Sequence, residues 1–285
     1  LRNILPNANL EYDGFVEVMN FGLCTHEVSR LIGVFNYSPN LLSKYILQIR
    51  KLRTMGPQIK RGALVVFEGL DRSGKSTQSR LLVESLKKSG KEAELMVFPD
   101  RSTPIGKIIG SYLSNKVDVN DKALHLLFTA NRFEKMNNIK KLLYSGVNVV
   151  VDRYSFSGIV FSSAKNGMDP DWCKIPESGL PAPDVVFFLH LPFNDMRSRP
   201  GFGHERYETV SFQSKVLQEY EHLASEFNFT KIEAKDSIEN IQNNVLNHAL
   251  KIIDVVEGTD LHYFDFIEKE MESYQKENVS MTKII

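Results

Sequence analysis

The sequence has few cysteines and no excess of charge of either sign. Its two cysteines among 285 residues, Cys24 and Cys173, lie far apart and lack the spacing of a metal site. This favours a reducing compartment over a disulfide framework, so we expect a cytoplasmic location, with a nuclear or mitochondrial pool left open. Lysine plus arginine (35) equals aspartate plus glutamate (35), which is untypical of general nucleic-acid binders. We therefore expect no nucleic-acid partner.

Long apolar runs are absent as well. No stretch approaches the roughly 18 apolar residues that a membrane-spanning helix needs, so no membrane partner is expected. Hydrophobic residues make up 42% and charged residues 25% of the chain, which is ordinary for globular domains. The length is enough for one large or two modest domains.

The organised pattern begins near Arg61, where strand-like and helix-like segments start to alternate. Short runs rich in β-branched and aromatic residues predict buried strands at 63–69, 93–98, 147–154 and 183–191, and a weaker one at 227–234. Apolar residues at helical spacing predict helices at 75–90, 122–146 and 238–253. This order predicts an α/β fold with a parallel, doubly wound sheet flanked by helices. In such sheets, ligands bind beyond the carboxyl ends of the strands.

A phosphate-binding loop follows the first predicted strand. The pattern G-x-x-x-x-G-K-[ST] is met by Gly69, Gly74, Lys75 and Ser76. The glycines let backbone N–H groups approach phosphate oxygens, Lys75 neutralises the outer phosphates, and the Ser76 hydroxyl is a ligand for Mg²⁺. Asp152, at the end of another predicted strand, is expected to be the second Mg²⁺ partner through a water molecule. The loop therefore predicts ATP and Mg²⁺ as cofactors.

The free positions of this loop hold an unexpected pair, Asp71 and Arg72. A carboxylate repels a triphosphate, so ATP alone does not explain Asp71. A small-molecule kinase also needs a pocket for its acceptor, and that pocket should contain arginines if the acceptor is a phosphate. Candidates follow strands or lie on one helix: Phe98, Arg101, Phe128, Arg132, Arg153, Ser157 and Gly158. An aromatic ring beside an arginine suits a flat base, although from the pattern alone Phe128 could pack in the core and Arg132 could form a surface ion pair.

Six segments, in this order and at compatible spacings, resemble eukaryotic thymidylate kinases of the P-loop nucleoside monophosphate kinase family. They are RGALVVFEGLDRSGKSTQSRLL, FPDRSTPIGK, LHLLFTANRFE, VVVDRYSFSG, GLPAPDVVFFL and FGHERYE, within residues 61–252. The resemblance implies the P-loop NTPase fold with a short lid and, as is usual in the family, a homodimer. It also implies transfer of the γ-phosphoryl group of ATP to dTMP, giving dTDP for dTTP synthesis.

The resemblance further implies a role for each matching residue. The ATP site would comprise Gly69, Arg72, Ser73, Gly74, Lys75, Ser76, Thr77 and, near adenine in the lid, Arg199. The dTMP site would comprise Asp71, Phe98, Arg101, Phe128, Arg132, Arg153, Ser157, Gly158, Tyr207 and Gln213. In this reading Phe128 stacks on thymine, Arg132 hydrogen-bonds its carbonyl edge, and Asp71 accepts a hydrogen bond from the sugar 3′-hydroxyl. Arg72, Lys75 and Asp71 would be the catalytic residues, with Arg72 on the transferred phosphate.

The domain boundaries follow from the extent of these patterns. Residues 55–256 are expected to form the thymidylate kinase domain and residues 257–285 an acidic C-terminal tail, read as a solvated helix or a frayed end. Met55 resembles a natural start, so residues 1–54 are interpreted as an upstream extension or a gene-model artefact. A targeting segment, for which the stretch is rather acidic, and an accessory segment are the alternatives.

Two other functions stay open at this stage. A kinase for another nucleoside monophosphate or for a deoxynucleoside would share the P-loop, although the latter would need fewer arginines for an acceptor phosphate. A catalytically weak binding or regulatory homologue is the second alternative, and the presence of Arg72, Lys75, Ser76 and Asp152 speaks against it.

Overall fold

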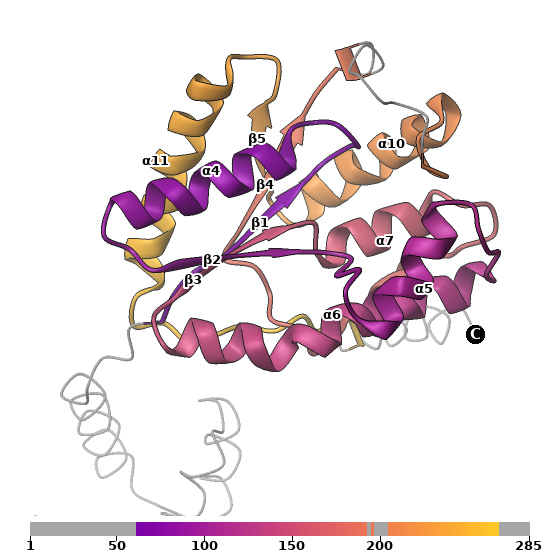
Figure 1. Cartoon of the computed structure of the whole chain (residues 1–285), viewed down its shortest axis with the longest axis horizontal. Coiled ribbons are helices and arrows are strands. Elements are labelled where there is room, and N and C mark those ends of the chain that lie inside the picture. Colours follow the sequence, from indigo (N-terminus) through magenta and orange to yellow (C-terminus); the bar gives the residue numbers. More distant parts are fainter. Residues whose placement is uncertain (1–60, 193–194, 197–204, 268–285) are drawn as a thin grey trace, which may run out of the picture. The chain divides into compact units, whose positions relative to one another are not determined.

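Five parallel strands form one sheet in the order β2-β3-β1-β4-β5 (Figure 1). They are β1 (Leu64–Glu68), β2 (Ala93–Val97), β3 (Asn148–Asp152), β4 (Val185–His190) and β5 (Thr230–Glu233). The computed structural model describes residues 61–192, 195–196 and 205–267. The strands predicted from the sequence, including the weaker fifth one, are confirmed.

Helices cover both faces of this sheet. They are α4 (Lys75–Lys88), α5 (Pro104–Leu113), α6 (Asp121–Tyr144), α7 (Ser155–Ser163), α8 (Pro170–Lys174), α10 (Val210–Glu226) and α11 (Ile238–Val256). In Figure 1, α4 and α11 lie on one side of the sheet and α6 and α7 on the other. The predicted α/β, doubly wound architecture is confirmed. No helix among the described residues is long and apolar enough to cross a membrane.

The register brings two strand ends together at the centre of the sheet. Phe67 in β1 pairs with Asp152 in β3, so the loop after β1 begins beside the residue that follows β3. All five residues of each of these strands are buried. This explains why their sequences read as continuous apolar runs rather than as alternating ones.

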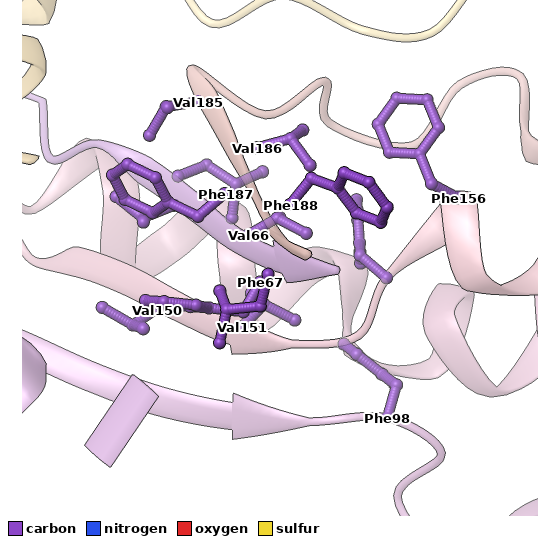
Figure 2. Packing of buried hydrophobic residues seen from close by; sticks show 14 of the residues in the cluster. Val66, Phe67, Phe98, Val150, Val151, Phe156, Val185, Val186, Phe187 and Phe188 are labelled. Carbon is purple, nitrogen blue, oxygen red and sulfur yellow. The ribbon is translucent and has the colours of Figure 1, made fainter. Parts of the chain in front are cut away.

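The core lies mainly on the central strands (Figure 2). Phe67 and Phe187, from the neighbouring strands β1 and β4, have ring centroids 5.4 Å apart. Phe156 of α7 packs edge-on against Phe229 at 4.7 Å and Phe264 at 5.4 Å. These contacts anchor the first turn of α7, which carries several of the predicted site residues.

Three sequence-based expectations fall wholly or partly outside the described residues. Residues 1–54 and the predicted lid residue Arg199 lie outside them, as do residues 268–285. The expectation of a solvated tail after residue 256 is wrong for residues 257–267, which include buried side chains. Leu261, Phe264 and Phe266 are buried in the main core, where Phe264 packs against Phe156 of α7 and Phe266 against Phe227.

Candidate functional site

The phosphate-binding loop joins β1 to α4 and contains three residues with positive φ. Gly69 has φ 141°, Arg72 has φ 60° and Gly74 has φ 103°. A side chain at Gly69 would place its Cβ 2.6 Å from the carbonyl oxygen of Leu189, so only glycine fits there. This backbone course leads directly into the N-terminus of α4, where unpaired N–H groups and the helix dipole favour an anion.

The Lys75 side chain is buried inside this loop. Its ammonium Nζ donates to the carbonyl oxygen of Leu70 at 2.5 Å and to Ser73 Oγ at 3.3 Å. Burial, followed by the nearby charge of Arg153, lowers the pKa of Lys75 to about 7. An anionic phosphate in the loop would offset both effects, because it favours the charged form of the amine.

Ser76 and Asp152 meet at the carboxyl edge of the sheet. The Ser76 hydroxyl donates a short hydrogen bond to Asp152 Oδ2. The second carboxylate oxygen, Asp152 Oδ1, is buried and has no hydrogen-bond partner among the described residues. Buried carboxylate oxygens without partners are costly unless a cation or water compensates them. Oxygen donors of this kind suit Mg²⁺, so the two residues fit the predicted metal role.

A cavity of about 490 Å³ opens beside the loop and collects most of the predicted acceptor residues. Those that line it are Asp71, Phe98, Arg101, Phe128, Arg132, Arg153, Ser157, Gly158 and Tyr207, together with Ser76 and Asp152. The cavity therefore joins the predicted metal residues to the predicted base-binding residues in one space.

Asp71 faces an arginine from a different strand end. The guanidinium of Arg153, which has φ 67°, forms an ion pair with Asp71 Oδ1 and donates to the carbonyl oxygen of Gly69 at 3.3 Å. Gln213 Nε2 donates to Asp71 Oδ2 at 2.7 Å. Gln213 is fully buried and is not among the residues that line the cavity. It therefore holds Asp71 without facing the cavity itself.

Two further arginines pair with carboxylates from one short segment, residues 205–208. Glu208 Oε1 accepts from Arg72 Nε at 3.1 Å and Nη2 at 3.0 Å, and Glu205 accepts from Arg101 at 2.8 Å. Glu208 is buried, whereas Arg101 is exposed. Arg101 and Glu205 line the cavity, whereas Arg72 and Glu208 do not, so a phosphate entering it would compete with a carboxylate for Arg101.

The predicted base-binding pair lies on α6 at a spacing of four residues. Phe128 is half-buried and lines the cavity, so the core-packing alternative accounts for only part of its surface. Arg132 is buried and forms a bidentate ion pair with Glu177, so the surface ion-pair alternative is wrong. A side chain at Gly158 would place its Cβ 2.4 Å from Arg132 Nη2, so any larger residue there would displace the guanidinium from its present position.

A buried carboxylate next to the loop did not stand out in the sequence. Glu68 Oε1 accepts from the backbone N–H groups of Tyr154 and Ser157, both at 3.0 Å. Its Oε2 accepts from Ser157 Oγ at 2.5 Å and from the Tyr220 hydroxyl at 2.8 Å. Burial raises the pKa of Glu68, and the hydrogen bond from Ser157 opposes that rise. Glu68 therefore caps the first turn of α7 from β1 and ties the two strand ends together.

Phe161 is another residue without a local sequence signal. It lines the cavity, and its ring lies 5.2 Å from the guanidinium carbon of Arg153. Its ring also lies 5.6 Å from that of Tyr207, which stacks on Phe212 at 4.9 Å. These aromatic contacts form the apolar wall beside Arg153.

Residues 115–118 read Asn-Lys-Val-Asp and match the N-K-x-D pattern expected of a switch GTPase. They follow α5 rather than a strand, so they do not lie at the carboxyl edge where this fold binds ligands. Asp118 pairs with Arg206 at 2.6 Å, and the carbonyl oxygen of Val117 accepts from the same guanidinium. Asp118 is 90% exposed, so this match lies in a surface ion pair outside the candidate site.

Comparisons with known proteins give one consistent result. The family model described as thymidylate kinase matches residues 67–245. The thymidylate kinase of Homo sapiens is 50% identical over 188 residues, which cover 65% of this chain and 89% of that protein. The thymidylate kinase of Plasmodium falciparum is 47% identical over 193 residues, covering 68% of this chain and 92% of its own length. The solved structure of thymidylate kinase from Candida albicans has a TM-score of 0.61 at 35% identity and covers 72% of this chain and 99% of that chain.

Proposed function

The chain belongs to the thymidylate kinase family and is an enzyme that phosphorylates dTMP to dTDP, and on this premise we propose how its residues carry out the transfer. The γ-phosphoryl group of ATP moves in line to an oxygen of the dTMP phosphate. One observation carries the proposal: a single cavity joins the phosphate loop and Ser76 to Arg101, Arg153 and Phe128.

The reaction needs little covalent help from the protein. A phosphate oxygen of the acceptor is already nucleophilic near neutral pH, so no general base is required. The obstacle is bringing two anions together, and catalysis consists of positioning and charge neutralisation. Lys75 and the loop N–H groups bind the ATP phosphates, while Arg101 and Arg153 hold the dTMP phosphate. The guanidinium of Arg72 binds the γ-phosphoryl group as it is transferred.

Mg²⁺ would be held by Ser76 and by Asp152, the latter through water. The unpaired, buried Oδ1 atom of Asp152 supports this assignment. When bound, the ion neutralises charge on the ATP phosphates. Lys75 and Arg72 supply the protein's own positive charge at the ATP phosphates.

Asp71 explains how one loop can serve both substrates. Its carboxylate pairs with Arg153 and accepts a hydrogen bond from Gln213, so its charge is compensated, and Asp71 lines the cavity. We assign it to the 3′-hydroxyl of dTMP. The thymine then lies between Phe128 and Arg132, with Tyr207 and Phe98 closing the cavity.

The test of this proposal is a coupled assay of ADP release across dTMP, dUMP, UMP, CMP and thymidine. We expect the highest kcat/KM with dTMP and no turnover of thymidine, because the arginines need an acceptor phosphate. A preference for another acceptor would overturn the assignment of the base pocket. Absence of turnover with every acceptor would favour a binding or regulatory protein.

Replacing Asp71 with asparagine should weaken dTMP binding more than ATP binding. The amide keeps the size of the side chain but loses the charge that compensates Arg153, so we expect the KM for dTMP to rise about tenfold. Steady-state kinetics with each substrate varied in turn measure the two KM values. A change in the KM for ATP alone would show that Asp71 does not contact the sugar.

The oligomeric state and the compartment are also proposed. A homodimer is the usual state of the family, and the cytoplasm suits a chain whose buried Cys173 is a free thiol. Sedimentation velocity of the purified protein and microscopy of a tagged full-length chain would test the two assignments.

A further inference from the structure

We propose that Glu177 is a positioning residue that fixes Arg132 for reading the base of the acceptor. The inference rests on the proposed function, since it concerns how the same cavity selects thymine. Glu177 lies on the short 3-10 helix η1 (Ile175–Glu177), 45 residues from Arg132 in the sequence. It is fully buried and does not line the cavity, whereas Arg132 does.

The ion pair between these residues occupies one edge of the guanidinium. Glu177 Oε2 accepts from Arg132 Nε at 2.8 Å, and Oε1 accepts a short hydrogen bond from Nη2. Thr129 supports the pair, because its hydroxyl donates to Glu177 Oε1 at 2.5 Å and accepts from Arg132 Nη2 at 3.3 Å. A planar guanidinium held at two nitrogens has a single orientation.

The remaining edge of the guanidinium is available to a ligand. Among the described residues, none accepts a hydrogen bond from Arg132 Nη1, although the side chain is only 2% exposed. Gly158 closes the other side, because a Cβ there would lie 2.4 Å from Nη2 and 3.0 Å from Nη1. Glu177 on one side and Gly158 on the other therefore direct Nη1 towards the cavity.

This orientation selects a base by its hydrogen-bonding edge. Nη1 can only donate, and the 4-position of thymine or uracil is a carbonyl acceptor. Cytosine presents an amino group there, which also donates, so a fixed guanidinium rejects it. A guanidinium released from Glu177 could turn its donors away and would discriminate less, because selectivity depends on a buried polar group that has no other partner.

The test compares acceptor selectivity in three variants and the wild type. Glu177→Gln keeps the size of the side chain but turns one acceptor into a donor facing Arg132. We expect the ratio of kcat/KM for dTMP to that for dCMP to fall about tenfold or more. Thr129→Val removes the supporting hydroxyl without changing the charge. It should also lower the dTMP-to-dCMP ratio. This variant provides a second readout if Glu177→Gln folds poorly.

Asp184→Asn is the matched control. Asp184 forms another bidentate pair, with the buried Arg61, at 2.8 Å and 2.7 Å. Asp184 is itself partly buried, and it precedes β4 at the opposite end of the sheet from the cavity. Its loss should lower the melting temperature as the loss of Glu177 does, while the dTMP-to-dCMP ratio stays at the wild-type value. A merely structural role for Glu177 would give this same pattern, so an unchanged ratio in both Glu177→Gln and Thr129→Val would overturn the inference. A wild type that prefers dCMP would instead overturn the proposed function.

Discussion

Replacing Arg72 with alanine is expected to lower kcat about 10³-fold with little change in the KM for dTMP. The reason is that a cation on the phosphoryl group acts mainly in the transition state, where charge is redistributed between donor and acceptor oxygens. Arg72 has the left-handed φ of 60° within the loop and is held by Glu208 through Nε and Nη2. Its guanidinium is thus directed by two constraints before any substrate arrives. Single-turnover kinetics with saturating ATP and dTMP would measure the chemical step directly.

The control for this experiment is Arg80→Ala. Arg80 is exposed on α4, eight residues after Arg72, so its removal changes the net charge equally without touching the loop. We expect kcat for this variant to match that of the wild type. An unchanged rate in Arg72→Ala would remove Arg72 from the mechanism, and a large rise in the KM for dTMP alone would assign it to acceptor binding.

Replacing Lys75 with methionine is expected to reduce kcat/KM for ATP at least 10²-fold. Methionine fills similar space but cannot donate hydrogen bonds or neutralise the outer phosphates, and loss of one such preorganised donor typically costs 10²–10³ in rate. The exposed Lys87 on the same helix supplies the control, since Lys87→Met should leave the rate unchanged. Initial rates at varied ATP concentration would measure the effect, and full activity of Lys75→Met would contradict the assignment.

The lowered pKa of Lys75 adds a dependence on pH to the same prediction. In the free protein this pKa is about 7, so at pH 8.5 the amine is mostly neutral. Bound triphosphate favours the ammonium form and raises the pKa, so binding at this pH must take up a proton. ATP affinity should therefore fall as pH rises above 7. Calorimetric titrations at pH 8.5 in buffers of different ionisation enthalpy would detect the uptake, and its absence would show that Lys75 is already charged.

The same shift has a consequence for the ligand-free fold. Between about pH 7 and the ordinary value of 10.5, the unfolded chain keeps a proton on Lys75 that the folded chain has released. The free energy of unfolding should therefore rise with pH across this window through Lys75, because the unfolded state binds more protons. Bound ATP should remove that contribution, since it restores the charge in the folded state.

The sequence by itself determined the sheet and the donor side of the site. The buried strands are continuous β-branched and aromatic runs, and each ends where the chain turns at glycine, proline or a polar residue. The phosphate loop is also local, because its glycines, Lys75 and Ser76 are neighbours in the chain and their positions follow from one strand-to-helix connection. Helices α5, α7, α8 and α10 were not predicted. Helix α7 lies directly after Arg153 in a mostly apolar segment without clear helical periodicity, and its first turn is capped by Glu68 from β1 rather than by its own side chains.

Only the tertiary structure decided which carboxylate faces which arginine. Arg132 pairs with Glu177, Arg72 with Glu208 and Arg101 with Glu205, over sequence separations of 45, 136 and 104 residues. The sequence contains 35 aspartates and glutamates, and no periodicity or motif indicates which of them pairs with each of these arginines. The choice follows from which strand ends and turns meet around the cavity, because an ion pair forms only where packing brings two charged groups within a few ångströms. The local sequence therefore supplied the residues of the site, and the long-range packing of the chain gave them their orientation.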